Sequence, residues 1–145
     1  AREHDELDRR RRERSDRARA SQDPTVATDF GDGPQIVTIK PTDYLFSSEG
    51  CATWTNDLSP ITSSPTAPFG DGEYFVGSDV AAGTWSAPGS QVCYWQRESG
   101  FSGEDAQIIA DNGGDGDPTT NVTVTIAPTD AGFFTDGCGT WTKVG

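Results

Sequence analysis

The sequence contains no methionine and a single histidine, and these absences exclude several kinds of chemistry. Because His4 lies in a charged N-terminal segment and no Cys-x-x-Cys motif occurs, the usual ligand set of a zinc site is missing. His4 is also the only imidazole that could serve as the base for a Ser or Cys nucleophile. We therefore expect no cofactor and no zinc site. The missing methionine predicts that a signal or anchor was removed before Ala1.

Long apolar runs are also missing, and cationic residues are scarce outside the first 20 positions. No run is long enough to cross a bilayer, so we expect no membrane span in this chain. Residues 1–20 contain eight Arg against six acidic residues, whereas the rest contains 17 acidic residues and, as cations, only Lys40, Arg97 and Lys143. An acidic body repels phosphate groups, which excludes nucleic-acid binding by the folded part.

Residues 1–24 are predicted to be a charged leader that is either helical or disordered. Acid-to-arginine pairs four residues apart, such as Asp5 and Arg9, favour a helix. Leu7 is the only large aliphatic residue in this segment, so no apolar seam supports a coiled coil. The pattern therefore favours a solvated spacer over an Arg-rich nucleic-acid motif at residues 9–12.

The chain does contain an internal repeat. Residues 37–55, VTIKPTDYLFSSEGCATWT, and residues 124–142, VTIAPTDAGFFTDGCGTWT, are identical at 12 of 19 positions. A Phe-Gly-Asp-Gly sequence precedes each copy, at residues 30–33 and 69–72. The first copy follows its Gly-Asp-Gly turn almost directly, so we interpret the first region as a shortened version of the second.

Short β-branched and aromatic runs separated by Gly, Pro and Asp predict an all-β fold. We expect a small disulfide-linked antiparallel β-sandwich or barrel behind the charged leader. The predicted parts are residues 1–24 as leader, 25–57 as a partial β unit, 58–68 as a Pro/Ser/Thr linker and 69–145 as a complete β-sandwich unit. The expected strands are Gln35–Ile39, Cys51–Thr55, Glu73–Gly77, Gly83–Ser86, Gln91–Arg97, Asn121–Ile126 and Gly139–Val144, while Gln107–Asp111 fits a strand or one helical turn.

Three cysteines allow one internal disulfide and leave one thiol over. Cys93 and Cys138 each lie in a strand-like run near a Trp, and a bridge between them would stabilise the fold by roughly 3–4 kcal/mol. We favour this pairing, and the alternative is a bridge from Cys51 to either of the other two. In the favoured pairing, Cys51 is an unpaired thiol or forms an inter-chain bridge.

Aromatic and acidic residues are the candidates for ligand binding. Sugar-binding modules use exposed aromatic platforms, and the candidates here are Trp54, Trp85, Trp95 and Trp141, although strand alternation places some of these rings in the core. The acidic turn DNGGDGD is a weak calcium candidate that lacks the EF-hand pattern, and its ligands would be Asp111, Asp115 and Asp117.

A carboxylate pair of the glycosidase type is available by residue type alone. Its candidates are Glu98, Glu104, Asp105 and Asp111. Carboxylates are frequent throughout a chain this acidic, so they do not single out a catalytic pair. We therefore predict that the protein is not an enzyme.

The second half of the chain contains four motifs in a fixed order. They are GDGEYFVGSDVAAGTW at 70–85, CYWQR at 93–97, IIADN at 108–112, and VTI followed by GCGTW within 124–141. Together they resemble a β module of exported proteins and lipoproteins of actinobacteria and their phages. The resemblance covers Phe69–Val144 and implies an exported β domain with its two cysteines paired, but no activity and no catalytic residues.

These observations predict a non-enzymatic, extracytoplasmic structural or interaction module displayed on a cell envelope or a virion. Because the strands and the thiol of the first copy lack partners, we expect assembly with copies of itself or with a homologous module. The alternatives are a carbohydrate-binding module that recognises an envelope glycan and a small carboxylate-dependent hydrolase. The expected location is extracellular, at the cell surface or on a virion.

Overall fold

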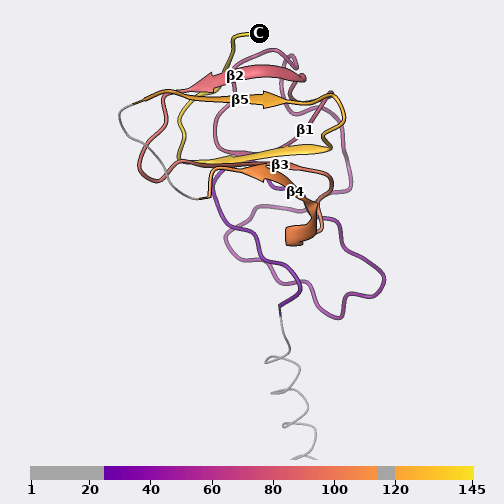
Figure 1. Ribbon diagram of the computed structural model, residues 1–145. Helices are drawn as coiled ribbons and strands as arrows, with labels where there is room; N and C mark the ends of the chain where they lie inside the picture. The colour runs from indigo at the N-terminus through magenta and orange to yellow at the C-terminus, as the bar shows by residue number, and fades with distance from the viewer. Residues whose placement is uncertain (1–24, 114–119) are drawn as a thin grey trace, which may run out of the picture.

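Two antiparallel β-sheets packed face to face form the fold in a computed structural model (Figure 1), which confirms the all-β prediction. The structure describes residues 25–113 and 120–145, so the predicted leader lies outside the described residues. The described elements are β1 (Gly72–Phe75), β2 (Gly83–Ala87), β3 (Tyr94–Glu98), the 3₁₀ helix η1 (Asp105–Gln107), β4 (Ile108–Asp111), β5 (Val122–Ile126), β6 (Gly132–Asp136) and β7 (Thr142–Lys143).

One sheet has the strand order β1-β6-β3-β4 and the other has the order β5-β2-β7. In β5, Val124 and Ile126 face the core while Thr123 and Thr125 face solvent, as alternation predicts for a strand with one buried face. The hydroxyl of Thr125 forms a cross-strand hydrogen bond of 3.0 Å with the hydroxyl of Thr84. Two repeated segments, β5 and β6, therefore lie in opposite sheets.

An aromatic cluster fills the space between the sheets. The Phe69 ring packs against Tyr74, Trp85, Phe133 and Trp141, with ring centroids between 4.8 and 6.4 Å apart. The backbone N–H of Phe69 donates to the Trp141 carbonyl, and the N–H of Trp141 donates back to Phe69. These rings form most of the core, together with the buried disulfide.

The disulfide joins Cys93 to Cys138, so the favoured pairing is confirmed. The bridge spans 45 residues, and a loop of that length corresponds to about 4 kcal/mol of stabilisation on the chain-entropy estimate. Cys51 is the free cysteine, and it is exposed. Within the described part of the chain, no helix is long and apolar enough to cross a membrane.

The strand β6 was missed by the sequence analysis because it is buried on both faces. Phe133 points into the core, whereas Phe134 points to the outer face of the sheet and is also buried. The segment before the first copy covers that outer face: a Cβ on Gly31 would lie 3.3 Å from Cζ of Phe134. Without an exposed polar face, β6 shows no alternating pattern.

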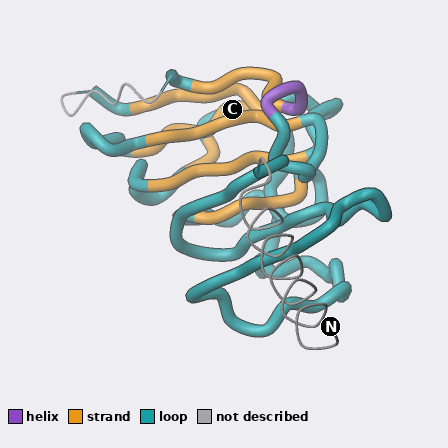
Figure 2. Tube along the Cα trace, turned by 90° about the horizontal axis from the view of Figure 1, so that it is seen from below, coloured by secondary structure: helices purple, strands orange, loops and turns teal. Residues whose placement is uncertain are grey.

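Two of the expected strands, Gln35–Ile39 and Cys51–Thr55, are not formed. Their residue types suit a strand. In the first segment, however, the N–H groups of Ile36 and Thr38 bond to the Glu73 side chain and to the Phe101 carbonyl and form no ladder, and among the described residues no strand pairs with the second segment. The indigo and purple segments in Figure 1 instead run as loops outside both sheets, on the side of β3 and β4. In Figure 2 the orange strands lie together while the teal loops extend beyond them.

The ion pair between the partly exposed Arg97 and the buried Asp130 predicts a loss of stability when it is broken. The Arg97 guanidinium donates to both carboxylate oxygens of Asp130 at 2.6 and 3.0 Å, and Asp130 is buried. We expect Asp130→Ala to lower the free energy of unfolding by about 1.5–3 kcal/mol, because it removes a charge-assisted hydrogen bond and leaves the Ala127 N–H without its acceptor. Denaturant unfolding measures this change.

The matched control is the exposed ion pair between Lys40 and Glu104. Its N–O distance is 2.9 Å, and both side chains are more than a third exposed. We expect Glu104→Ala to cost much less than Asp130→Ala, because solvent screens an exposed ion pair. Equal losses in the two variants would contradict the assignment of Arg97–Asp130 as a structural pair.

Candidate interaction site

The first copy of the repeat has the same turn as the second. In the first copy, the Lys40 N–H donates to Oδ2 of Asp43 at 2.8 Å, and the Asp43 N–H donates to the Lys40 carbonyl at 3.0 Å. In the second copy, Ala127 and Asp130 form the same two bonds at 2.9 and 3.0 Å. The Pro-Thr-Asp sequence common to both copies accounts for this turn, because the Asp side chain caps it.

The two copies also share an aromatic pair. Phe46 and Trp54 pack edge to face, with centroids 5.3 Å apart and an interplanar angle of 84°. Phe133 and Trp141 occupy the same repeat positions, with centroids 5.3 Å apart at 90°. The same pair of side chains therefore adopts the same geometry in two different surroundings.

The same hydrogen bond anchors both indole rings. Nε1 of Trp54 donates to the Ser48 hydroxyl at 3.0 Å, and Nε1 of Trp141 donates to the Thr135 hydroxyl at 2.9 Å. Ser48 and Thr135 stand at the same position of the repeat, where the sequence keeps a hydroxyl although the residue type changes. This equivalence was missed by the sequence analysis, although the repeat offset carries the signal for it.

The glycine before the cysteine has the same backbone conformation in both copies. Gly50 has φ of 73° and Gly137 has φ of 72°, in the left-handed region that favours glycine. This turn leads to Cys51 in the first copy and to Cys138 in the second. Cys138 is bonded to Cys93, whereas Cys51 has no disulfide partner.

Burial is what separates the two copies. Phe133 and Trp141 are 0 % exposed, whereas Phe46 is 42 % exposed and Trp54 is 39 % exposed. We call the exposed part of the first copy, Phe46, Cys51 and Trp54, the open face. Other large apolar side chains around it in sequence are also exposed, namely Ile39, Tyr44, Leu45, Leu58 and Ile61.

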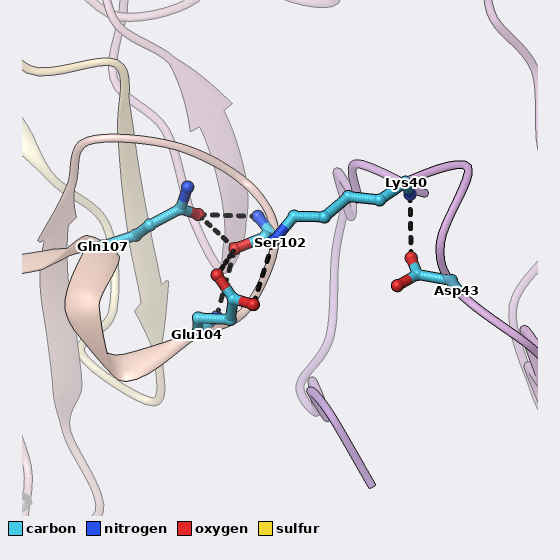
Figure 3. A network of polar contacts seen from close by, with 5 residues as sticks. All are labelled: Lys40, Asp43, Ser102, Glu104 and Gln107. Atoms are coloured by element: carbon cyan, nitrogen blue, oxygen red, sulfur yellow. Dashed lines mark hydrogen bonds and ion pairs between the residues drawn. The ribbon is translucent and has the colours of Figure 1, made fainter.

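A polar network ties the first copy to the complete unit (Figure 3). Nζ of Lys40 binds Oε1 of Glu104 at 2.9 Å, while the backbone of Lys40 forms the turn bond to Asp43. The single proton of the Ser102 hydroxyl is shared between Oε2 of Glu104 at 3.1 Å and Oε1 of Gln107 at 2.6 Å. The Lys40 bond, followed by that from Ser102, lowers the pKa of Glu104. The network fixes one end of the first copy beside η1.

Backbone bonds hold the preceding residues against the sheet edge. The Ile36 N–H donates to Oε2 of Glu73 at 2.9 Å, and the Glu73 N–H donates to the Pro34 carbonyl at 2.7 Å. The Thr38 N–H donates to the Phe101 carbonyl at 2.8 Å. The first copy is therefore attached to the complete unit at its start, and the open face follows this attachment along the chain.

Two buried carboxyl groups, Glu73 and Glu98, lie beneath this attached segment. Burial, followed by the hydrogen bond and the charge of Glu98, raises the pKa of Glu73 to about 10, and burial also raises the pKa of Glu98. Oε2 of Glu98 is buried and receives no donor from the other described side chains. A proton held between the two carboxyl groups satisfies it, and Glu73 keeps this proton at neutral pH because its pKa is raised to about 10.

The candidate sugar-binding tryptophans are divided between core and surface. Trp85 and Trp141 are fully buried between the sheets, so these two candidates present no ring to a ligand. Trp95 is partly buried and stacks on Phe133, with centroids 6.4 Å apart. Of the four, Trp54 alone is exposed. The rings of Trp85 and Trp141 fill the space between the two sheets, which explains their burial.

The carboxylates considered for catalysis lie in different surroundings. Glu98 is buried in the pair with Glu73, and Glu104 is bound to Lys40. Asp105 begins η1, and Asp111 ends β4. Of the calcium candidates, Oδ1 of Asp111 accepts the Gly113 N–H at 2.6 Å, while Asp115 and Asp117 lie outside the described residues.

The structure brings together three other carboxylates that the sequence analysis did not consider. Oxygen atoms of Asp32, Asp71 and Asp136 lie within 4.8 Å of one another. Asp32 and Asp71 come from the two Phe-Gly-Asp-Gly sequences, and Asp71 accepts the Gly137 N–H at 3.0 Å. Because exposed acidic groups are common without an ion, this cluster alone does not define a metal site.

Comparison with protein families identifies the family of this chain. Residues 9–55 and 66–142 match the family model of the Rv1352-like extracellular domain. The chain belongs to this family. The domain is therefore extracellular, as expected, and both matched ranges end at the same position of the repeat, Thr55 and Thr142. No curated protein and no solved structure matches the chain.

The raised pKa of Glu73 predicts how stability depends on pH. The folded domain retains a proton that the unfolded chain releases above pH 4.5, so the free energy of unfolding falls as pH rises from 4.5 towards 10. We expect Glu73→Gln, which keeps an acceptor for Ile36, to be more stable than the wild type at pH 8 by at least about 1 kcal/mol, the equivalent of one pKa unit. At pH 4 the two proteins should be equally stable.

Denaturant unfolding at several pH values measures this difference, and Glu104→Gln is the matched control. Lys40 lowers the pKa of Glu104, so removing this carboxylate should not weaken the loss of stability at high pH. A Glu73→Gln variant that loses stability between pH 4 and 8 as steeply as the wild type would refute the shared proton.

Proposed function

We propose that this extracellular domain is a non-enzymatic interaction module that assembles, on a cell envelope or a virion, through the open face of its first copy. The observation that carries the proposal is the Phe46–Trp54 pair, which has the geometry of the core pair Phe133–Trp141 but no cover. The first copy is thus a preformed half of a β unit, and another polypeptide can supply the missing half.

The distribution of exposed apolar residues supports the proposal. Within the described residues, seven of the twelve exposed large hydrophobic side chains lie between Ile39 and Ile61. This concentration of exposed apolar side chains in one segment favours that segment as the interaction site. The pair also needs little reorganisation to bind, because the bond from Trp54 to Ser48 already fixes the indole.

Self-association through the open face is tested by sedimentation equilibrium over a wide range of concentration, with and without a reducing agent. We expect the wild-type chain to form dimers or larger species, and Trp54→Ser to weaken association by roughly tenfold or more, because the loss of a buried ring costs more than the 1.4 kcal/mol that tenfold represents. Ile109→Ser, which removes an exposed apolar residue of β4, should leave association unchanged.

The thiol is examined in the same samples by mass spectrometry under non-reducing conditions. Cys51→Ser should abolish any covalent dimer and leave the Cys93–Cys138 bridge intact. A wild-type chain that remains monomeric at every concentration, with a free Cys51, would contradict self-assembly.

Carbohydrate binding is the second candidate, and one observation favours it. An open depression is lined by Tyr94, Asp105, Ile108, Asp111 and Gly113, which combines an aromatic ring with two carboxylates. Such a combination suits the apolar face and the hydroxyl groups of a sugar. A glycan array probed with and without calcium tests this candidate, and Tyr94→Ala should abolish any binding found. Signals that survive this change would remove the depression as the sugar site.

A further inference from the structure

The complete unit shows which groups cover the second copy of the repeat. Two residues of β3 and the residue before this strand do so at alternate positions: Cys93 bonds to Cys138, Trp95 stacks on Phe133, and Arg97 donates to Asp130. These contacts come from a segment with the pattern Cys-x-Trp-x-Arg, in which side chains at alternate positions share one face. The strand β3 is therefore the natural cover for the repeated motif.

The first copy contains an equivalent of each residue that this strand contacts in the second copy. By the repeat offset, Cys51 stands for Cys138, Phe46 for Phe133 and Asp43 for Asp130. Oδ2 of Asp43 accepts the turn N–H, as Oδ2 of Asp130 does. Among the described residues, however, Asp43 has no guanidinium partner, Phe46 contacts no second stacked ring other than Trp54, and Cys51 is free.

We propose that the open face is a docking site for an extended strand of the pattern Cys-x-Trp-x-Arg supplied by a second polypeptide. This inference rests on the proposed role of the first copy in interaction, and it specifies the partner. The strand of the same chain cannot occupy the site, because its Cys93 is already bonded and buried in the complete unit. The occupant therefore comes from a homologous module that presents such a strand unpaired.

The register of the complete unit predicts how the strand lies. There, β3 runs antiparallel to β6, with Tyr94 opposite Asp136 and Gln96 opposite Phe134. The positions equivalent to Asp136 and Phe134 in the first copy are Glu49 and Ser47. The Trp of the docked strand then stacks on Phe46, and its Arg reaches the carboxylate of Asp43. The acidic surroundings favour this cationic partner.

Capture becomes covalent by thiol–disulfide exchange. The Cys51 thiolate attacks the sulfur of a partner cysteine that arrives as a disulfide with a small thiol. A new bond forms between the Cys51 Sγ and that sulfur, the original S–S bond breaks, and the small thiol leaves as its thiolate. One disulfide replaces another, so no further oxidant is needed.

A synthetic peptide tests the site on the full chain. The probe is the chain's own segment 91–98, QVCYWQRE, with its cysteine activated as the thiopyridyl disulfide. Absorbance of the released pyridine-2-thione gives the rate, and mass spectrometry identifies Cys51 as the modified residue. We expect this peptide to react roughly tenfold faster than a scrambled peptide of the same composition, which corresponds to about 1.4 kcal/mol of docking energy.

Variants separate docking from ordinary thiol reactivity. Peptides carrying Trp95→Ala or Arg97→Glu should lose the advantage, and so should the protein variant Asp43→Asn toward the unchanged peptide. Asp43→Asn keeps an oxygen that can accept the turn N–H of Lys40, and circular dichroism checks that it folds. Its reaction with a small activated disulfide should remain unchanged, because that reagent makes no contact with residue 43.

Equal rates for the native and scrambled peptides would overturn the docking site. That outcome is distinct from failure of self-assembly. A chain that captures the peptide but remains monomeric supports the strand site and contradicts self-assembly. A chain that dimerises through Trp54 but does not select the peptide supports self-assembly and contradicts the strand site.

Discussion

The packing of Trp141 between the two sheets is the constraint on which the rest of the structure depends. Its ring meets Phe69 and Phe133, its indole N–H is held by Thr135, and its backbone pairs with Phe69. The neighbouring disulfide from Cys138 then fixes β3 beside β6. A cluster of this kind closes the sandwich because each ring buries a large apolar area while its polar atom retains a partner.

The first copy shows which parts of this arrangement are local. The Pro-Thr-Asp turn, the glycine turn and the bond from Trp54 to Ser48 join residues no more than six positions apart, so they form without a sheet. The cover of the aromatic pair comes from distant strands, and the first copy lacks them. Nineteen residues therefore specify the shape of the open face but not its burial.

Strands could be predicted from the sequence where their residue types form a recognisable pattern along the chain. The strand β5 was predicted from its short β-branched run. The pairing of Cys93 with Cys138 was favoured over a bridge from Cys51, and the structure contains it. The strand β6 was missed because both of its faces are covered. Gln35–Ile39 does not form a strand because its N–H groups bond to the Glu73 side chain and to the Phe101 carbonyl instead of to a ladder. The Glu73–Glu98 pair could not be predicted from the sequence, because its burial depends on the segment around Pro34 and Ile36 that bonds to Glu73.

A simple estimate explains why a thiol stands beside the open face. Aromatic side chains bury about 150–250 Å² each, and Phe46 and Trp54 leave about two fifths of that exposed. Covering both rings removes roughly 150 Å² from water, which is worth about 4 kcal/mol. Association costs about 4–15 kcal/mol in lost freedom, so the rings alone hold a partner weakly even with a salt bridge at Asp43. A bond to Cys51 makes the contact permanent without enlarging the face, and the aromatic pair then serves to select the strand.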